Sequence, residues 1–413
     1  MNIFVFEDEL VSRLNPISLA RPAYAISCGA YRLIDWLRAL SLPLFGAVRE
    51  YLQEIQRVDF ADLNNRPLTG ATLMVNARLV PSVQVFQTLK KWLAESRPGW
   101  VMHGEEVATL CLPPVVLPPQ VDIGPTGIAA YFDALKLEGL PTLEHRLPLF
   151  VYPHDVIRSN MEILTANLEY RIAHGRYTEI LPGVFAEPGA MVGQHVVTET
   201  KAGPIVLDEN ATVGPFCYLR GPAFLGRGAK LIEHAAIKDG VSAGHTTKIG
   251  GEVEAAIIEP YTNKQHHGFL GHSYLGSWIN LGAGTCNSDL KNTYGKVNLE
   301  YRGEKISTGM QFVGCMMGDY SKTAINTGIF TGKIIGAGSM LYGFVTTNVP
   351  SFVNYARLFG QVTELPAEVM VATQLRMFQR RNVAQRPCDV QLIHAMYELT
   401  RSERQLAGEP LSL

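Results

Sequence analysis

The pattern of hydrophobic positions changes character near residue 178. Before that point, short apolar runs alternate with amphipathic segments of helical period. We expect strands over residues 3–6 and 71–75, and helices over residues 31–40, 83–92 and 157–173. Such alternation predicts βαβ units around a mainly parallel sheet, and therefore a Rossmann-like α/β domain over residues 1–178.

After residue 178 the hydrophobic period becomes six. Aliphatic residues recur at this step without a slip: Leu207, Val213, Leu219, Leu225, Leu231 and Ile237. The step resumes further along at Met317, Thr323, Ile329, Ile335 and Leu341. One inward aliphatic residue per hexapeptide is typical of a parallel β-helix, in which three hexapeptides make a triangular coil. We predict an all-β, left-handed parallel β-helix over residues 179–348, because accidental spacing in a β-sandwich explains the unbroken run poorly.

Helical periodicity returns in the last part of the chain. Val371, Leu375 and Phe378 share one apolar face, and a similar face follows between residues 390 and 397. The pattern predicts a helical C-terminal tail over residues 349–413.

Composition narrows the functional classes. The 413 residues carry a formal net charge of −2 and no basic run, so nucleic acid and anionic membrane surfaces are not expected partners. No apolar stretch approaches a membrane span, and the residues after Met1 lack the basic region of a signal peptide. The six cysteines form no CxxC pair and read as reduced thiols, so we expect a cytoplasmic protein.

Chemistry-bearing residues are densest between residues 262 and 285. His266, His267 and His272 lie within seven residues, and an Asn-Leu-Gly-Ala-Gly-Thr turn begins at Asn280. Acyl transfer to a sugar amine or hydroxyl needs a base that titrates near neutral pH, which histidine provides. It also needs a fixed donor for the tetrahedral oxyanion, and a backbone N–H of the Gly-Ala-Gly turn suits that role.

The spacing of His266, Phe269-Leu270-Gly271 and the turn at Asn280 resembles a known family. It is similar to the β-helix half of the bifunctional UDP-N-acetylglucosamine pyrophosphorylase/glucosamine-1-phosphate N-acetyltransferase, over about residues 205 to 345. The resemblance implies acetyl-CoA as co-substrate and a homotrimer with acyl-CoA sites between subunits.

The resemblance also implies roles for individual residues. His266 takes the place of the catalytic base, and Asn280 would orient it or hold the acyl oxygen. The remaining residues assigned to the substrate site are Arg220, Lys264, Phe269 and Asn287. Phe269 replaces a tyrosine of the family, which removes a hydroxyl from the sugar-phosphate pocket. The position of a further substrate-binding lysine falls on Lys238 or Glu254, depending on the direction of counting, which suggests extra coil sequence between them.

The N-terminal region resembles a divergent sugar nucleotidyltransferase-like domain. The Gly-rich loop and Pro-Lys pair of the standard enzymes are absent, and Arg13 and Arg21 would contact the nucleotide phosphates instead. Asn76 stands where those enzymes have a metal-binding aspartate. Asp155 and Asn160 are the remaining candidates for a Mg²⁺ site.

Two functional hypotheses remain from the sequence. The first is a bifunctional transferase that couples acyl-CoA-dependent N-acetylation of an amino sugar phosphate to nucleotidyl transfer, giving a UDP-sugar. The second is a monofunctional β-helix acyltransferase whose N-terminal domain binds a ligand without catalysis. A lesser alternative is a zinc-dependent hydratase like the γ-class carbonic anhydrases, with His234, His267 and His272 as ligands.

Overall fold

The computed structural model describes residues 1–63, 69–116, 127–134 and 139–406. The chain divides into two compact units that interleave in sequence. The N-terminal unit comprises Met1–Leu14, Arg21–Ser27 and Tyr31–Tyr152. The β-helix unit comprises Asn15–Ala20, Cys28–Ala30 and Pro153–Leu413. No helix in these described ranges is both long enough and apolar enough to cross a membrane.

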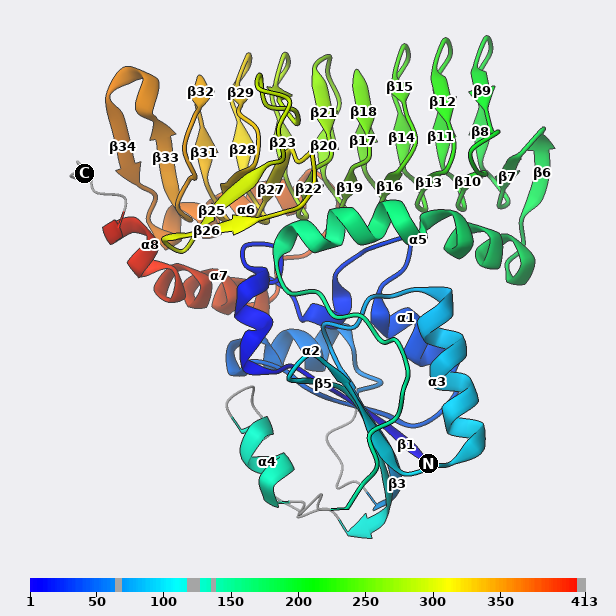
Figure 1. Ribbon diagram of the computed structural model, residues 1–413. Helices are drawn as coiled ribbons and strands as arrows, with labels where there is room; N and C mark the ends of the chain where they lie inside the picture. Colours follow the sequence, from blue (N-terminus) through cyan, green and yellow to red (C-terminus); the bar gives the residue numbers. More distant parts are fainter. Residues whose placement is uncertain (64–68, 117–126, 135–138, 407–413) are drawn as a thin grey trace. The chain divides into compact units, whose positions relative to one another are not determined.

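The N-terminal unit is built on a mixed sheet of strand order β2-β1-β3-β5-β4 (Figure 1). The strands are β1 (Asn2–Phe6), β2 (Leu44–Ala47), β3 (Thr69–Asn76), β4 (Gly99–His103) and β5 (Glu106–Val116). β1 pairs in parallel with β2 and β3, whereas β5 runs antiparallel to both β3 and β4. The α/β prediction is confirmed, but the sheet is mixed, because a hairpin returns β5 alongside β3.

Short helices accompany this sheet. They are α1 (Leu33–Ala39), α2 (Gln53–Asp59), α3 (Val83–Glu95) and α4 (Ile128–Ala134), with 3₁₀ turns η1 (Glu9–Leu14), η2 (Ala23–Ala25) and η3 (Glu50–Leu52). α3 begins where the Ser82 hydroxyl accepts the Val85 N–H, and it ends at Ser96 in the left-handed conformation. It buries Val85, Phe86, Leu89 and Trp92, one face of the helical period.

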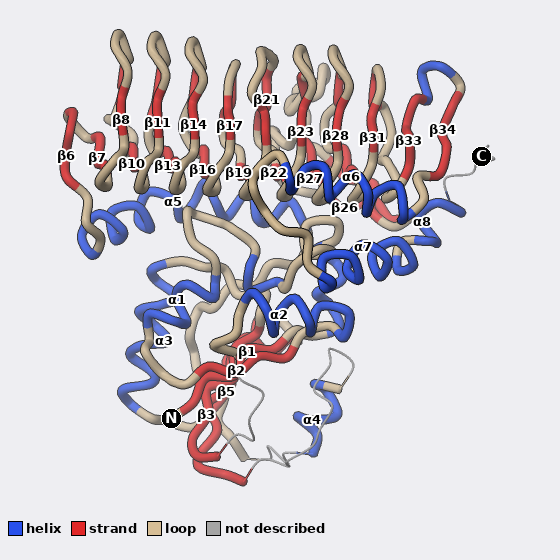
Figure 2. The backbone as a smooth tube through the Cα atoms, turned by 180° about the vertical axis from the view of Figure 1, so that it is seen from behind, coloured by secondary structure: helices blue, strands red, loops and turns tan. Residues whose placement is uncertain are grey.

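The β-helix unit stacks short parallel strands into the successive coils seen edge-on in Figures 1 and 2. The first face contains β6 (Thr178–Leu181), β7 (Val184–Ala186), β10 (Ile205–Leu207), β13 (Ala223–Leu225), β16 (Val241–Ala243), β19 (Ile257–Ile258), β22 (Tyr274–Leu275), β27 (Cys315–Met317) and β30 (Lys333–Ile335). The second face contains β8 (Met191–Val192), β11 (Thr212–Val213), β14 (Lys230–Leu231), β17 (Lys248–Ile249), β20 (Asn263–Lys264), β23 (Asn280–Leu281), β28 (Lys322–Thr323), β31 (Met340–Leu341), β33 (Val353–Ala356) and β34 (Gln361–Glu364). The third face contains β9 (Val197–Glu199), β12 (Tyr218–Arg220), β15 (Ala236–Ile237), β18 (Glu252–Glu254) and β21 (Phe269–Gly271), followed by β24 (Cys286–Asn287), β29 (Gly328–Ile329) and β32 (Phe344–Val345).

One aliphatic core runs through all the coils. Every aliphatic residue of the first hexapeptide run, from Leu207 to Ile237, is buried in it. The second run, from Met317 to Leu341, joins the same core except for Thr323, which is buried beside it. The predicted β-helix is therefore confirmed. An antiparallel hairpin of β25 (Asn298–Tyr301) and β26 (Glu304–Ser307) is inserted between β24 and β27.

Helices cover two of the faces. α5 (Pro153–His174) packs Leu164 and Leu168 against Val206 and Phe224 on the first face. This packing places α5 in the β-helix unit, whereas the sequence pattern grouped it with the domain over residues 1–178.

After the turn η4 (Arg357–Phe359), the tail forms α6 (Ala367–Gln379), α7 (Pro387–Leu399) and α8 (Arg401–Leu406), as predicted (Figure 2). α6 reaches the second face through Phe378, whose ring centroid lies 4.4 Å from that of Trp278.

Candidate functional site

A shortened corner sets the geometry of the histidine segment. Four residues connect the second face to the third in most coils, but only Gly250 and Gly251 connect β17 to β18. The inward position of the next coil holds Lys264 in place of an aliphatic residue, in register with Ile249. Its Nζ donates to the carbonyl oxygens of Gly250 at 2.8 Å and His266 at 2.6 Å. Lys264 therefore fills the space at this corner from the inside.

The environment of Lys264 differs from that of a substrate-binding lysine at a surface. Its side chain is buried, and desolvation lowers the pKa of its ammonium group to about 8. Two hydrogen bonds to backbone carbonyl oxygens hold the ammonium group inside the corner. The contact of Lys264 with substrate stays a prediction.

His266 and His267 lie in the corner between β20 and β21, and both are exposed. Within the described residues, no hydrogen bond from the protein orients the His266 ring. Asn280 faces outward on the second face, where its Oδ1 lies 3.4 Å from Nδ2 of Asn263. The two residues predicted to act together, His266 and Asn280, thus lie on neighbouring coils, and no hydrogen bond joins their side chains in the described part of the chain.

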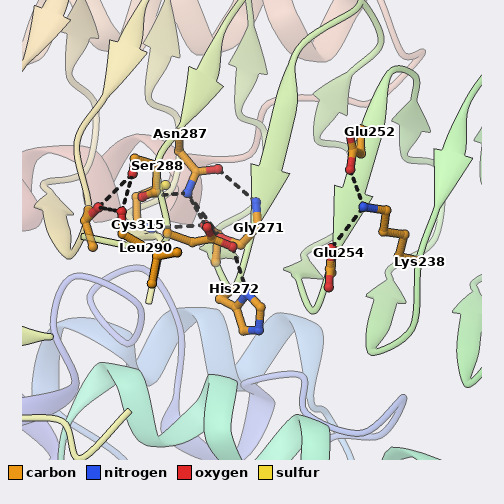
Figure 3. A network of polar contacts seen from close by, with 12 residues as sticks. Lys238, Glu252, Glu254, Gly271, His272, Asn287, Ser288, Leu290 and Cys315 are labelled. Atoms are coloured by element: carbon orange, nitrogen blue, oxygen red, sulfur yellow. Dashed lines mark hydrogen bonds and ion pairs between the residues drawn. The ribbon is translucent and has the colours of Figure 1, made fainter. Parts of the chain in front are cut away.

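A paired histidine lies at the following corner. Nδ1 of His272 lies 2.8 Å from Oδ2 of Asp289, and both side chains are mostly buried (Figure 3). The His272 ring also stacks on Phe312, with centroids 5.1 Å apart. A carboxylate can only accept, so the Nδ1 hydrogen belongs to His272, and in the neutral imidazole Nε2 is then the acceptor.

Asn287 fixes the strand that leads to this histidine. Its Oδ1 accepts the Gly271 N–H at 2.9 Å, and its Nδ2 donates to the Gly271 carbonyl and the Ser273 hydroxyl, both at 3.1 Å (Figure 3). A Cβ on Gly271 would come within 2.2 Å of the Asp289 carboxylate, so a larger residue there would displace the Asp289 side chain. Asn287, predicted as a substrate contact, is buried and braces the His272 corner.

Ion pairs follow the third face towards this corner. Arg220, the predicted phosphate contact, is half-buried and paired with Asp239. Lys238 lies between Glu252 and Glu254, with its Nζ 2.5 Å and 3.4 Å from their carboxylates (Figure 3). The two alternative lysine positions from the sequence are therefore neighbours. Phe269, the residue in place of the family tyrosine, is half-buried at the start of β21 on this face.

In the N-terminal unit, a buried carboxylate organises the region after β1. Glu7 accepts the backbone N–H groups of Ala23 and Arg49, both at 2.8 Å, and pairs with the Arg49 guanidinium. Burial lowers the pKa of Arg49, but Glu7 and Tyr51 together outweigh it and the net shift is upward. Arg49 also donates to the Arg21 carbonyl at 3.0 Å, whereas Arg13 is exposed in η1.

Asn76 lies in a network at the carboxyl ends of β1 and β3. Its Nδ2 donates to Asp8 at 2.7 Å and to the Val107 carbonyl at 3.0 Å, and its Oδ1 accepts the Arg78 N–H at 3.0 Å. The buried Arg78 guanidinium pairs with both Asp8 and Glu106. Every polar atom of the Asn76 side chain is thus occupied within the protein.

The predicted metal ligands do not converge. Asp155 and Asn160 are five residues apart on α5, about 140° around the helix. Asn160 is buried and uses both ends of its amide, accepting from Gly29 N–H and donating to the Gly240 carbonyl, each at 2.9 Å. Across the parts of the chain that the structure describes, no group of three His, Cys, Asp or Glu side chains could hold a metal ion, for Mg²⁺ or for the zinc alternative.

Residues 3–176 match the family model described as "Sugar nucleotidyl transferase". The match covers the N-terminal part of the chain. A "Bifunctional sugar-1-phosphate nucleotidylyltransferase/acetyltransferase" of Sulfurisphaera tokodaii is 27% identical over 148 residues, covering 35% of this chain and 37% of the relative. "Bifunctional protein GlmU" of Thermotoga maritima is 24% identical over 249 residues, covering 53% of this chain and 48% of the relative.

This chain therefore spans less than half the length of these two relatives. Among solved structures, the UDP-N-acetylglucosamine acyltransferase of Francisella novicida aligns with a TM-score of 0.33 at 16% identity, over 57% of this chain and 79% of that one. The N-terminal part of this chain is a sugar nucleotidyltransferase domain, joined to a β-helix and distantly related to bifunctional nucleotidylyltransferase–acetyltransferases.

Sequence reasoning did not find the His272–Asp289 pair. His272 was assigned only to the zinc alternative, and Asp289 had no role. The partners are 17 residues apart, about one coil of the β-helix. That separation is the signal that could have found them.

Proposed function

We propose that this protein is a bifunctional transferase of sugar-nucleotide biosynthesis. Its β-helix would transfer an acyl group from acetyl-CoA or a related acyl-CoA to an amino sugar phosphate, with glucosamine-1-phosphate as the first candidate. Its N-terminal domain would transfer a nucleotidyl group to give a UDP-sugar such as UDP-N-acetylglucosamine. The observation that carries the acyl-transfer part is the oriented His272–Asp289 pair on a β-helix fused to a sugar nucleotidyltransferase domain.

His272 has the arrangement of a general base. Asp289 holds the Nδ1–H, so Nε2 can accept a proton from the acceptor amine or hydroxyl. As that proton leaves, the acceptor nitrogen or oxygen bonds to the thioester carbonyl carbon. Collapse of the tetrahedral intermediate breaks the carbon–sulfur bond, and the imidazolium returns the proton to the departing thiolate. The Gly282-Ala283-Gly284 turn lies at the corner of His266 and His267 rather than at that of His272, because the Gly284 N–H donates to the His267 carbonyl at 3.1 Å. The Gly282 N–H also donates within the protein, to Thr323. Asn280 or the Ala283 N–H would therefore bind the oxyanion if His266 is the base.

His266 is the alternative base, because it occupies the position that the family resemblance assigns. Its exposed ring can reach a substrate without rearrangement, but no protein group in the described part of the chain fixes its tautomer. A base that relies on a second group for orientation is more effective than a free imidazole. This comparison favours His272 and leaves His266 as the residue to test beside it.

Single substitutions separate the two histidines. Thiol release from acetyl-CoA would be measured with a panel of amino sugar phosphates for the wild type, His272→Ala, Asp289→Asn and His266→Ala. We expect His272→Ala to lower kcat by about 10²–10⁴-fold with little change in KM. Asp289→Asn should lower kcat less, and His266→Ala should leave it within a few-fold. Full activity of His272→Ala together with an inactive His266→Ala would reassign the base to His266.

Nucleotidyl transfer rests on the family match, and one observation favours the monofunctional alternative. The side chains predicted for Mg²⁺ are engaged within the protein and do not fit a metal site, so no step is assigned to a metal. Pyrophosphate release from nucleoside triphosphates and sugar phosphates, measured with and without added Mg²⁺, separates the two hypotheses. If the wild-type protein releases no pyrophosphate and binds no nucleotide in calorimetry, the bifunctional hypothesis is wrong and the monofunctional acyltransferase remains.

A further inference from the structure

Two lysines stack on the outside of the second face. Lys230 on β14 is in register with Lys248 on β17, so their side chains leave neighbouring strands in the same direction. Adjacent strands are about 4.8 Å apart, and like charges directly opposite one another in a sheet are destabilising. The next outward residues along this face are Asn263 and Asn280. The protein thus holds two ammonium groups side by side on a regular scaffold.

The end of α6 adds two more cations. Phe378 anchors the helix on Trp278, and the chain then passes through Arg380 and Arg381. The Arg381 Nη2 donates to Oδ1 of Asn263 at 2.5 Å, and Asn263 is the register neighbour of Lys248. The Arg381 guanidinium therefore contacts the residue directly beside Lys248 on the neighbouring strand, and the two cations repel each other. We call Lys230, Lys248, Arg380 and Arg381 the cationic cluster.

No carboxylate in the described ranges forms an ion pair with any member of the cluster. The third face differs, because Arg220 pairs with Asp239, and Lys238 pairs with Glu252 and Glu254. Burial lowers the pKa of Lys248, and repulsion from Arg381, Lys230 and Arg380 lowers it further. Burial and the neighbouring Arg380 lower the pKa of Arg381 in the same way.

The helix dipole explains only part of this arrangement. Cations are favoured near a helix C-terminus, which accounts for Arg380 and Arg381 at the end of α6. It does not account for Lys230 and Lys248, which lie on strands and repel the two arginines. A cluster of like charges that lowers stability in the free protein indicates an anion that neutralises it when bound.

We propose that the cationic cluster binds the phosphates of a nucleotide-type ligand, and that this ligand is the acyl-CoA donor. The choice of acyl-CoA rests on the proposed acyl transfer. Its diphosphate and 3′-phosphate carry several charges over a distance that stacked lysines and an adjoining arginine pair can follow. Asn263 and Asn280 continue the same face from the cluster towards the turn proposed for the oxyanion. A sugar nucleotide has the same diphosphate chemistry and is the competing source.

Calorimetry with three probes tests the cluster in the full-length protein. The probes are CoA, UDP-N-acetylglucosamine and inorganic pyrophosphate, each titrated into the wild type, Lys248→Gln, Arg381→Gln and the control Lys201→Gln. Lys201 is an exposed lysine in a turn of the same unit, remote in sequence from the cluster. We expect each cluster variant to weaken CoA binding by about 5–20-fold, the control to bind like the wild type, and the dissociation constant to rise with salt.

The outcomes separate the cluster from the enzyme function. CoA binding that is unchanged in both cluster variants would overturn the cluster proposal while leaving acyl transfer intact. Loss of UDP-N-acetylglucosamine binding alone would assign the cluster to the sugar nucleotide and overturn the choice of acyl-CoA. If the cluster variants bind CoA more weakly but the wild type transfers no acyl group, the cluster proposal stands and the proposed acyl transfer is wrong. Thermal unfolding guards against misfolding, because Lys248→Gln relieves repulsion and should not lower Tm.

Discussion

On successive strands of the second face, the inward-facing residues Ile249, Lys264 and Leu281 follow one another. Lys264 is the charged residue among these three. Aliphatic side chains occupy the equivalent inward positions of the coils below it. A lysine there is tolerated because its stem packs in the core while its ammonium group donates to two carbonyl oxygens. Lys264 makes fewer apolar contacts than an aliphatic residue would, but its two hydrogen bonds fix the backbone of the corner that contains His266.

The lowered pKa of Lys264 makes a prediction about pH. The unfolded chain keeps the lysine proton up to its ordinary value near 10.5, whereas the folded protein loses it above about 8. Between these values the unfolded state binds more protons, so folding stability rises with pH. We expect wild type to gain about 2 kcal/mol relative to Lys264→Met between about pH 7.5 and pH 9.5, by urea unfolding.

Two features make this comparison specific. Lys322 also has a pKa lowered to about 8 by burial, but it is present in both proteins and cancels from the difference. Lys201→Met, at an exposed site, should show no such pH dependence. Parallel stability curves for wild type and Lys264→Met would show that the ammonium group is not desolvated in the folded state.

How much of the site could be predicted from the sequence depends on knowing the number of residues in each coil. The histidine-rich segment could be located from its composition, because those residue types are rare together. The partner of His272 could not, because a side chain one coil away is found only when the number of residues per coil is known. The inward step from Ile249 to Lys264 is 15 residues, whereas the step from Leu231 to Ile249 is 18. The two counts for the substrate-binding lysine differ by one coil, because Ile237 beside Lys238 is in register with Val253 beside Glu254. The extra coil sequence expected between them stays a prediction.

At the scale of elements, α5 shows how packing decides where a helix belongs. The hexapeptide strands were predictable because each step must bury an aliphatic residue in the same core. A helical period identifies an apolar face but not the sheet that covers it. Leu164 and Leu168 pack on the first face of the β-helix, and Asn160 links α5 to both Gly29 and Gly240.

Substitution of Asn160 distinguishes a structural link from a metal ligand. Asn160→Ala leaves a buried N–H and a buried carbonyl without partners, which should cost about 1–3 kcal/mol of unfolding free energy in urea. Glu162→Ala, at an exposed position on the same helix, should change it by less than about 0.5 kcal/mol. If Asn160→Ala instead keeps full stability and lowers Mg²⁺ affinity, the residue is a metal ligand as the sequence suggested.

At the scale of the whole molecule, the last coils leave aromatic rings uncovered. Phe330 and Phe344 are half exposed, and their ring centroids lie 6.4 Å apart. Phe344 projects from the third face at β32, where its ring lies over Gly328. Exposed apolar groups of this kind favour association between identical subunits.

We therefore expect a homotrimer in solution. Light scattering after size exclusion should give three times the 45.5 kDa of the chain. Phe344→Glu places a charge in the expected interface and should reduce the mass, whereas Met191→Glu, at an exposed position in the first coils, should leave it unchanged. A dilute monomer with full acyltransferase activity would contradict both the assembly and an active site shared between subunits.

At each end of the β-helix, one of the three faces finishes with a strand that runs against its neighbour. β6 is antiparallel to β7, and β34 is antiparallel to β33. A parallel edge left open would present a row of unpaired N–H and C=O groups on which an identical coil could continue the ladder. The reversed strands interrupt that template on one face at each end. A repeat that could in principle elongate without limit, as in an amyloid fibril, therefore meets a strand of the wrong direction on one face at each end.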